Sequence, residues 1–152
     1  MLCGESRTAT LVVIPMAAQE FVPKVLVIST NMISDPGIDF TGMGHIDYPS
    51  ASRIIRLPCS SMIRPEFIIH AFKSGFDAVY VAADGGDCPY LRDCPDRTAK
   101  RVQKAYELMK LSGIEQSRLK MAGICSVCSD AFARGMRGLS ETAKKLGPVK
   151  RL

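Results

Sequence analysis

Apolar runs alternate with amphipathic stretches along most of this chain. The run Val25–Ile28 is wholly apolar, which is typical of a strand that is covered on both faces. Three further runs, each bounded by turn or capping residues, have the length and composition of strands. They span residues 53–57, 77–83 and 118–124. The pattern therefore predicts four β-strands.

Each predicted strand is followed by a segment with helical character. The first, after Ser34-Asp35-Pro36, carries Gly37 and Gly42, which predict a short or irregular helix. The other three have apolar residues at helical spacing and are bounded by a proline or capping residue and by glycine. They span roughly residues 65–75, 96–113 and 129–147.

Strand and helix thus alternate four times, which predicts a parallel sheet because the crossovers between parallel strands are right-handed. The predicted fold is α/β: a small flavodoxin-like parallel sheet of about four strands with helices on both faces. We expect residues 21–152 to form a single domain. Residues 1–20 are expected to be an N-terminal extension, disordered or not translated, with translation beginning at Met16.

Composition and charge exclude several classes of function. The net charge of +5 is mild, and the basic residues are spread out without interleaved aromatic residues, so nucleic-acid binding is not expected. A basic face for an acidic partner protein agrees better with this charge. The apolar run Leu11–Ala18 is broken by Pro15 and falls short of the roughly 20 residues that span a bilayer, so membrane insertion is not expected either. We predict a cytoplasmic protein whose cysteines are free thiols and not a disulfide framework.

Five of the six cysteines follow the predicted ends of strands. These five are Cys59, Cys88, Cys94, Cys125 and Cys128. In a parallel sheet the carboxyl ends of the strands meet at one edge, where such folds bind their ligands. Thiolates suit zinc and iron–sulfur clusters. The cysteine pattern therefore predicts a metal or redox site at this edge.

Four of these thiols make the predicted ligand set, since a [2Fe–2S] cluster requires four thiolates. The predicted metal ligands are Cys59, Cys88, Cys125 and Cys128. The spacing of Cys125 and Cys128 serves redox disulfides, zinc sites and clusters alike. Cys94 either replaces Cys88 in the set or only starts a helix. We expect Met62 and Ile63 to be exposed beside the site and to face a partner.

An ordered set of short motifs resembles the delta subunit family of methyl-viologen-reducing hydrogenase, over residues 23–147. The motifs are Tyr48-Pro49, Arg53-Ile54-Ile55-Arg56, Cys59-Ser60, Pro65-Glu66-Phe67, Ala71-Phe72, Gly75-Phe76-Asp77-Ala78-Val79, Gly86-Asp87-Cys88 with Tyr90, and Ser112-Gly113-Ile114-Glu115. The resemblance implies a small [2Fe–2S] electron carrier. It also implies partners, namely the flavin- and iron–sulfur-containing subunits of heterodisulfide-reductase-like complexes in anaerobic metabolism.

The chain departs from the family pattern at the cysteines. The family has a Cys-x-x-Cys segment after the first strand, where this chain has Thr30-Asn31-Met32-Ile33. It has a further cysteine shortly before Gly-Asp-Cys, where this chain has Asp84-Gly85. Cys59 and Cys88 match family cysteines, whereas no family cysteine is expected at Cys125 and Cys128. If the strand order is 2-1-3-4, the loops that carry Cys59 and Cys125 must reach inward to share one cluster.

The leading hypothesis is a non-catalytic electron-transfer subunit with one [2Fe–2S] cluster. It would connect a redox enzyme to the flavin and iron–sulfur subunits of a heterodisulfide-reductase-like oxidoreductase complex. One alternative is a cluster-free structural adaptor in the same kind of complex. The other is a zinc- or thiol-based redox regulator.

Overall fold

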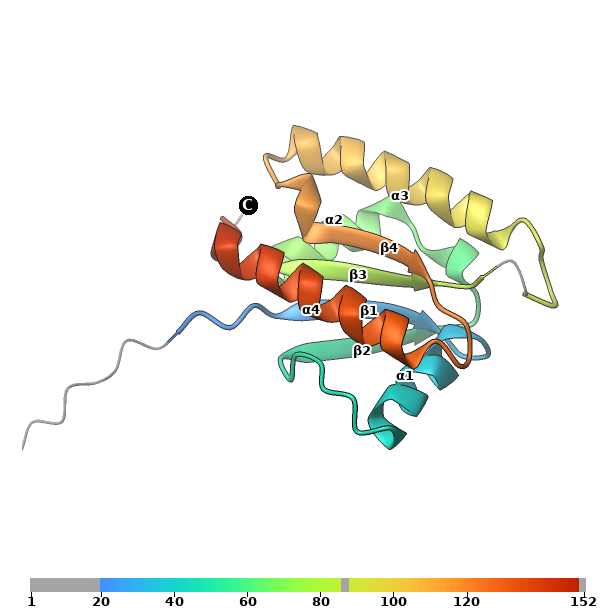
Figure 1. Cartoon of the computed structure of the whole chain (residues 1–152). Coiled ribbons are helices and arrows are strands. Elements are labelled where there is room, and N and C mark those ends of the chain that lie inside the picture. The colour runs from blue at the N-terminus through green and yellow to red at the C-terminus, as the bar shows by residue number, and fades with distance from the viewer. Residues whose placement is uncertain (1–19, 86–87, 151–152) are drawn as a thin grey trace, which may run out of the picture.

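The computed structural model describes residues 20–85 and 88–150 (Figure 1). Nearly all of the predicted N-terminal extension, including Met16 and Cys3, lies outside the described residues. Gly86 and Asp87, which belong to one of the family motifs, lie outside them as well.

The strands form one parallel sheet, as the alternating pattern predicted. They are β1 (Val25–Thr30), β2 (Ser52–Leu57), β3 (Ala78–Ala83) and β4 (Leu119–Gly123). Their spatial order is β2-β1-β3-β4, and each neighbouring pair is parallel. The flavodoxin-like order is therefore confirmed for these four strands.

Helices cover both faces of the sheet, because the crossovers are right-handed and the one from β1 to β2 runs in the opposite direction to those from β2 to β3 and from β3 to β4. The α-helices are α1 (Ser34–Met43), α2 (Pro65–Lys73), α3 (Cys94–Leu111) and α4 (Ser129–Leu146). Two short 3₁₀ turns, η1 (Ser60–Met62) and η2 (Gln116–Arg118), precede α2 and β4. Helices α1 and α4 pack together on one face, and α2 and α3 pack together on the other (Figure 1).

The side chains of the central strands alternate between two apolar cores. Val79 and Val81 of β3 pack on the side of α2 and α3, together with Phe72 and Met109. Tyr80 packs on the opposite side, against Phe132 of α4. Successive strand residues point to opposite faces, so a wholly apolar strand supplies both cores. This explains why the pattern at Val25–Ile28 predicted a strand covered on both faces.

Two helices differ from their predicted forms near the carboxyl edge of the sheet. Helix α3 begins at Cys94, two residues before the predicted cap Asp96. Helix α1 runs for ten residues despite its glycines. A Cβ atom at Gly37 would lie 2.3 Å from the carbonyl oxygen of Cys125, so glycine allows α1 to approach the loop after β4.

Candidate functional site

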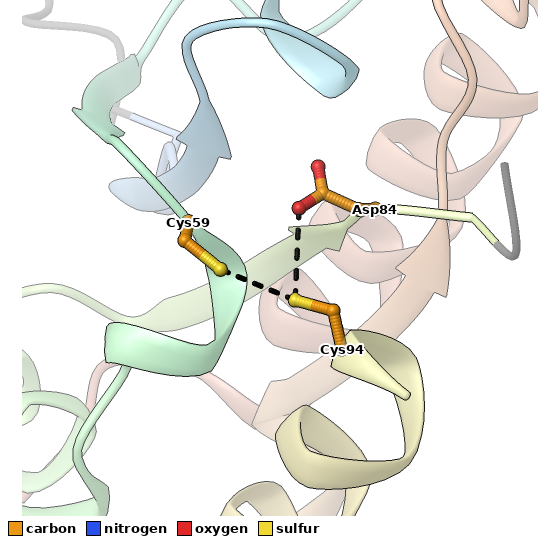
Figure 2. Close-up of side chains that lie close together, drawn as sticks. All are labelled: Cys59, Asp84 and Cys94. Carbon is orange, nitrogen blue, oxygen red and sulfur yellow. Dashed lines mark hydrogen bonds between the residues drawn. The ribbon is translucent and has the colours of Figure 1, made fainter. Parts of the chain in front are cut away.

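Two thiols and a carboxylate meet at the carboxyl edge of the sheet (Figure 2). Cys59 lies just after β2, Asp84 follows β3 directly, and Cys94 is the first residue of α3. Their possible ligand atoms all lie within 4.8 Å of one another. The Sγ atoms of Cys59 and Cys94 are 3.3 Å apart, and Cys94 Sγ lies 3.8 Å from Asp84 Oδ2. We call these three residues the thiol–carboxylate cluster.

A network of hydroxyl groups holds the cluster in place. The Ser60 hydroxyl donates to Asp84 Oδ2 at 3.3 Å and lies 3.1 Å from Cys94 Sγ. Thr98 of α3 donates to the Ser60 hydroxyl at 3.2 Å. The Thr30 hydroxyl, at the end of β1, donates to the other carboxylate oxygen of Asp84. Residues from β1, η1 and α3 therefore orient the carboxylate and the buried thiol.

The carboxylate of the cluster is buried, and within the described part of the chain no cationic side chain forms an ion pair with it. Asp84 is 2 % exposed, and Cys94 is fully buried. No ion pair found among residues 20–85 and 88–150 includes Asp84. A buried charge needs a partner of opposite sign or dense hydrogen bonding. Asp84 has the hydrogen bonds, and a bound cation would supply the missing charge.

The two cluster thiols differ in acidity. Burial raises the pKa of the Cys59 thiol above its ordinary value. Burial acts in the same direction on Cys94, but hydrogen bonds from Ser60 and Cys59 outweigh it and lower the pKa of Cys94. Cys94 is therefore the first of the two to become a thiolate, with Cys59 as its hydrogen-bond donor. A thiolate is the form that ligates metals.

A third thiol, that of Cys88, lies at a cavity next to the thiol–carboxylate cluster. Cys88 is buried and lines a cavity of about 320 Å³ together with Cys59 and Asp84. The cavity is also lined by residues 30–33, the stretch at which the resemblance led us to expect a Cys-x-x-Cys segment in the family. Asp84 belongs to the stretch Asp84-Gly85 at which the resemblance led us to expect a further cysteine in the family. The cavity at this edge is thus lined by two thiols and one carboxylate.

Cys125 and Cys128 are joined to each other. They form a disulfide with a Cα–Cα distance of 5.0 Å, directly before α4. The expectation that the cysteines are all free thiols is wrong for this pair, because their close spacing brings the two sulfurs within bonding distance. While the bond is present, neither sulfur is a thiolate ligand. The four-thiolate set of Cys59, Cys88, Cys125 and Cys128 stays a prediction, of which two members share the cavity.

The order of the strands keeps the Cys125–Cys128 loop away from Cys59. Cys59 follows β2 and Cys125 follows β4, and both β1 and β3 lie between these strands. Three strand spacings amount to about 14 Å. The loops at Cys59 and Cys125 therefore start far apart, and the thiol that approaches Cys59 comes from the start of α3 instead.

Sequence reasoning missed Asp84 as a candidate ligand and left Cys94 open. The position of Asp84, directly after an apolar strand, was the available signal, because such positions lie at the binding edge of a parallel sheet. The expected exposure beside the site is correct for Met62, which is 50 % exposed. It is wrong for Ile63, which is 1 % exposed because its side chain joins the core under α2 and α3.

The length and apolar character of the described helices bear on whether they could cross a membrane. None of those within residues 20–85 and 88–150 combines the length and the apolar character that crossing a membrane requires.

Comparison with known proteins gives a consistent result. The family model of the methyl-viologen-reducing hydrogenase delta subunit matches residues 25–147. The vhc iron-sulfur subunit of the F420-non-reducing hydrogenase of Methanococcus voltae is 33 % identical over 133 residues, which are 86 % of this chain and 91 % of that protein. The corresponding iron-sulfur subunit of Archaeoglobus profundus is 31 % identical over 134 residues, 88 % of this chain and 97 % of that protein.

A longer protein contains a similar segment. It is one of the subunits of the ferredoxin:CoB-CoM heterodisulfide reductase of Methanosarcina mazei, and it is 33 % identical over 128 residues. This match covers 84 % of the present chain but 16 % of the longer protein. The family resemblance found in the short motifs is confirmed, and the chain belongs to the methyl-viologen-reducing hydrogenase delta subunit family.

Proposed function

We propose that this protein is an electron-transfer subunit that carries one [2Fe–2S] cluster. It would connect a redox enzyme to the flavin- and iron–sulfur-containing subunits of a heterodisulfide-reductase-like complex. Relatives named as iron-sulfur subunits of hydrogenases and as part of a heterodisulfide reductase support this role. The proposal includes a cytoplasmic location, where a reducing environment keeps Cys59, Cys88 and Cys94 available for metal.

The convergence of donors at one cavity carries this proposal. The possible ligand atoms of Cys59, Cys94 and Asp84 lie within 4.8 Å of one another, and a third thiol, that of Cys88, lines a cavity together with Cys59 and Asp84. Soft thiolates select iron–sulfur clusters or zinc over harder ions. The buried carboxyl group of Asp84, which has no ion-pair partner among residues 20–85 and 88–150, also favours a cation here.

Four donors are therefore available for a cluster at this cavity. The set that we propose is Cys59, Cys94 and Asp84, whose possible ligand atoms lie within 4.8 Å of one another, with Cys88 from the cavity lining as the fourth donor. It supplies three thiolates and one carboxylate in place of the four thiolates that are usual for a [2Fe–2S] cluster. The set of Cys59, Cys88, Cys125 and Cys128 is the competing proposal. It requires the disulfide to be reduced and the loop after β4 to move toward β2. Bound here, the cluster would accept and release single electrons, while Ser60, Thr30 and Thr98 would fix the orientation of its ligands.

The test is purification without oxygen, followed by assays of iron and sulfide and a visible absorption spectrum. A [2Fe–2S] protein should be brown and contain about two iron atoms per chain. Cys59→Ser and Cys94→Ser should lose most of the iron, whereas Cys125→Ser and Cys128→Ser should retain it. Iron loss in the latter pair would instead favour the competing ligand set. A colourless wild-type protein without iron would contradict the cluster altogether.

Zinc is a second candidate because the donor set mixes sulfur and oxygen. Two thiolates and one carboxylate are zinc ligands, and tetrahedral zinc sites use three or four such groups. This would make the protein a zinc- or thiol-based regulator. One zinc per chain with no iron, in protein made with both metals supplied, would favour this interpretation over a cluster.

An exposed apolar surface next to the thiol–carboxylate cluster supports the alternative function, an adaptor without an iron–sulfur cluster. Met62 and Phe67 are half exposed, and Ile55 on the edge strand β2 is exposed as well. An adaptor would join its partners equally well after every thiol at the cavity is replaced by serine. Loss of electron transfer in such a variant, with assembly intact, would support the electron-transfer role instead.

A further inference from the structure

The disulfide between Cys125 and Cys128 is separate from the thiol–carboxylate cluster. It closes a loop between residues only three positions apart. A cross-link over so short a loop removes little freedom from the unfolded chain, so it is a weak structural staple. The bond therefore needs another explanation than the stability of the fold.

The backbone around this disulfide is held by other contacts. Ile124 donates its amide to the Ala83 carbonyl at 2.9 Å, which continues the sheet beyond β4. The Thr41 hydroxyl of α1 donates to the Ser129 carbonyl at 3.3 Å. Gly37 places the backbone of α1 directly against Cys125. With these contacts in place, breaking the sulfur–sulfur bond leaves the loop and α4 anchored.

The loop that carries the disulfide is open to solvent. Both cysteines are half-buried, and the two residues between them are exposed, with Val127 at 71 %. Cys128 packs against the core around Phe132 and occupies the position that caps α4. A thiolate there is stabilised by the amino-terminal end of an 18-residue helix. Cys128 is thus the better leaving group, and Cys125 is the sulfur to be attacked.

We propose that Cys125 and Cys128 form a redox-active disulfide, a two-electron centre that exchanges with a dithiol of a partner protein. One thiolate of the dithiol attacks Cys125 Sγ, the bond between the two cysteines breaks, and the electron pair leaves on Cys128 Sγ, which takes a proton. The second thiolate attacks its neighbour in the mixed disulfide and releases Cys125 Sγ, which takes the second proton. The chain gains two electrons and two protons, and the dithiol becomes a disulfide.

This role does not depend on whether the thiol–carboxylate cluster binds iron, zinc or no metal. It needs only the four-residue loop and its anchors. The chemistry differs from that of a [2Fe–2S] cluster, because a disulfide takes up electrons in pairs.

The experiment equilibrates the purified full-length protein, without oxygen, in a series of reduced and oxidised glutathione buffers. Alkylation and mass spectrometry of the peptide that contains both cysteines give the fraction of disulfide, and circular dichroism follows the fold. We expect the peptide to change from disulfide to doubly alkylated across the series while the fold stays unchanged. In a second assay, dihydrolipoamide should be oxidised with a stoichiometry of one per chain.

Variants of the two cysteines, with Ser126→Ala as a control, test whether this disulfide is the group that oxidises the dithiol. Cys125→Ser and Cys128→Ser should oxidise no dihydrolipoamide, whereas Ser126→Ala, which keeps both sulfurs, should behave as the wild type. A disulfide that persists in every buffer in which the protein is folded would show a purely structural bond and overturn the proposal. Two free thiols in every buffer, or iron lost from the Cys125→Ser variant, would overturn it as well, the latter by making the pair metal ligands.

Discussion

The two close pairs of cysteines at the carboxyl edge of the sheet are built in opposite ways. Cys59 and Cys94 are 35 residues apart, are not bonded, and sit in a network of hydroxyl and carboxylate groups. Cys125 and Cys128 are three residues apart, are bonded, and lie on apolar packing between α1 and α4. The first environment suits a bound cation, and the second suits a covalent bond. Polar surroundings, and not the thiols themselves, distinguish a metal site from a disulfide here.

The largest effect is expected at Asp84. Asp84→Asn keeps one oxygen, which can accept a hydrogen bond from either Thr30 or Ser60, but it replaces the other oxygen with an amide donor and removes the negative charge. We expect metal affinity to fall by more than about 100-fold, since even groups behind the ligands contribute 10–100-fold. Competition with a chelator measures this loss. Asp130→Asn, the same change on the exposed first turn of α4, should leave metal affinity unchanged. Equal affinity in both variants would remove Asp84 from the site.

The apolar core that Cys128 packs against should contribute less to the free energy of unfolding at high pH, because it contains Tyr80. Burial raises the pKa of Tyr80 to about 12. The folded protein therefore holds this proton more tightly than the unfolded chain, whose tyrosines ionise near pH 10. The contribution is present in full below pH 10 and is lost as the pH rises toward 12, and it amounts to roughly 2–3 kcal/mol. Urea unfolding at pH 8 and pH 11 measures about half of this loss, roughly 1.4 kcal/mol, because pH 11 lies midway between the two pKa values.

Tyr80→Phe isolates this effect. The Tyr80 hydroxyl is buried without a hydrogen-bond partner within the described residues, so its removal should cost nothing at pH 8. The variant should lose less stability than the wild type at pH 11. Tyr106→Phe should, by contrast, lower the stability at pH 8, because the Tyr106 hydroxyl that it removes donates to the Leu119 carbonyl at 3.1 Å. A Tyr80→Phe variant with the alkaline sensitivity of the wild type would contradict the buried ionisation.

A substitution in α1 can disturb the contact between this helix and the loop that carries the disulfide. Gly37→Ala would bring its Cβ to 2.3 Å from the Cys125 carbonyl oxygen, so the helix or the loop must move. We expect the free energy of unfolding to fall by about 2 kcal/mol, as in other overpacked sites. Gly42→Ala lies in the same helix, where an added Cβ meets nothing within 4 Å. It should stabilise the protein by about 0.5–1 kcal/mol. Equal changes in thermal unfolding would contradict the close approach.

A smaller effect is expected in the hydroxyl network of the thiol–carboxylate cluster. Thr98→Val keeps the shape of the side chain but removes the donor to the Ser60 hydroxyl. The expected loss of stability is about 1 kcal/mol, with weaker metal binding. Thr142→Val on α4 removes a similar bond within one helix, to the Gly138 carbonyl at 2.8 Å, and should not affect metal binding. If the two variants bind metal equally well, the network does not orient the ligands.

Much of the fold could be predicted because the signals are local. The apolar strands, the helix-starting Pro65 and the glycines at helix ends each act over a few residues, and parallel pairing follows from their alternation. The predicted start of α3 is two residues too late because Asp96 looks like a cap by itself. The earlier start has its own local signal, since Asp93 lies at the N-cap position and Pro95 in the first turn. As the first residue of α3, Cys94 contacts Ser60 and Cys59.

The sequence alone determined the family, the parallel sheet and the edge at which the cysteines gather. It also placed Cys125 and Cys128 three positions apart, a separation that the turn between them closes to bonding distance. Only the tertiary structure decided which distant groups meet. The order β2-β1-β3-β4 keeps the loop of Cys125 away from that of Cys59, while α3 brings in Cys94 and β3 ends in the buried Asp84. Contacts of this kind depend on how strands and helices are arranged in space, and no short stretch of sequence records that arrangement.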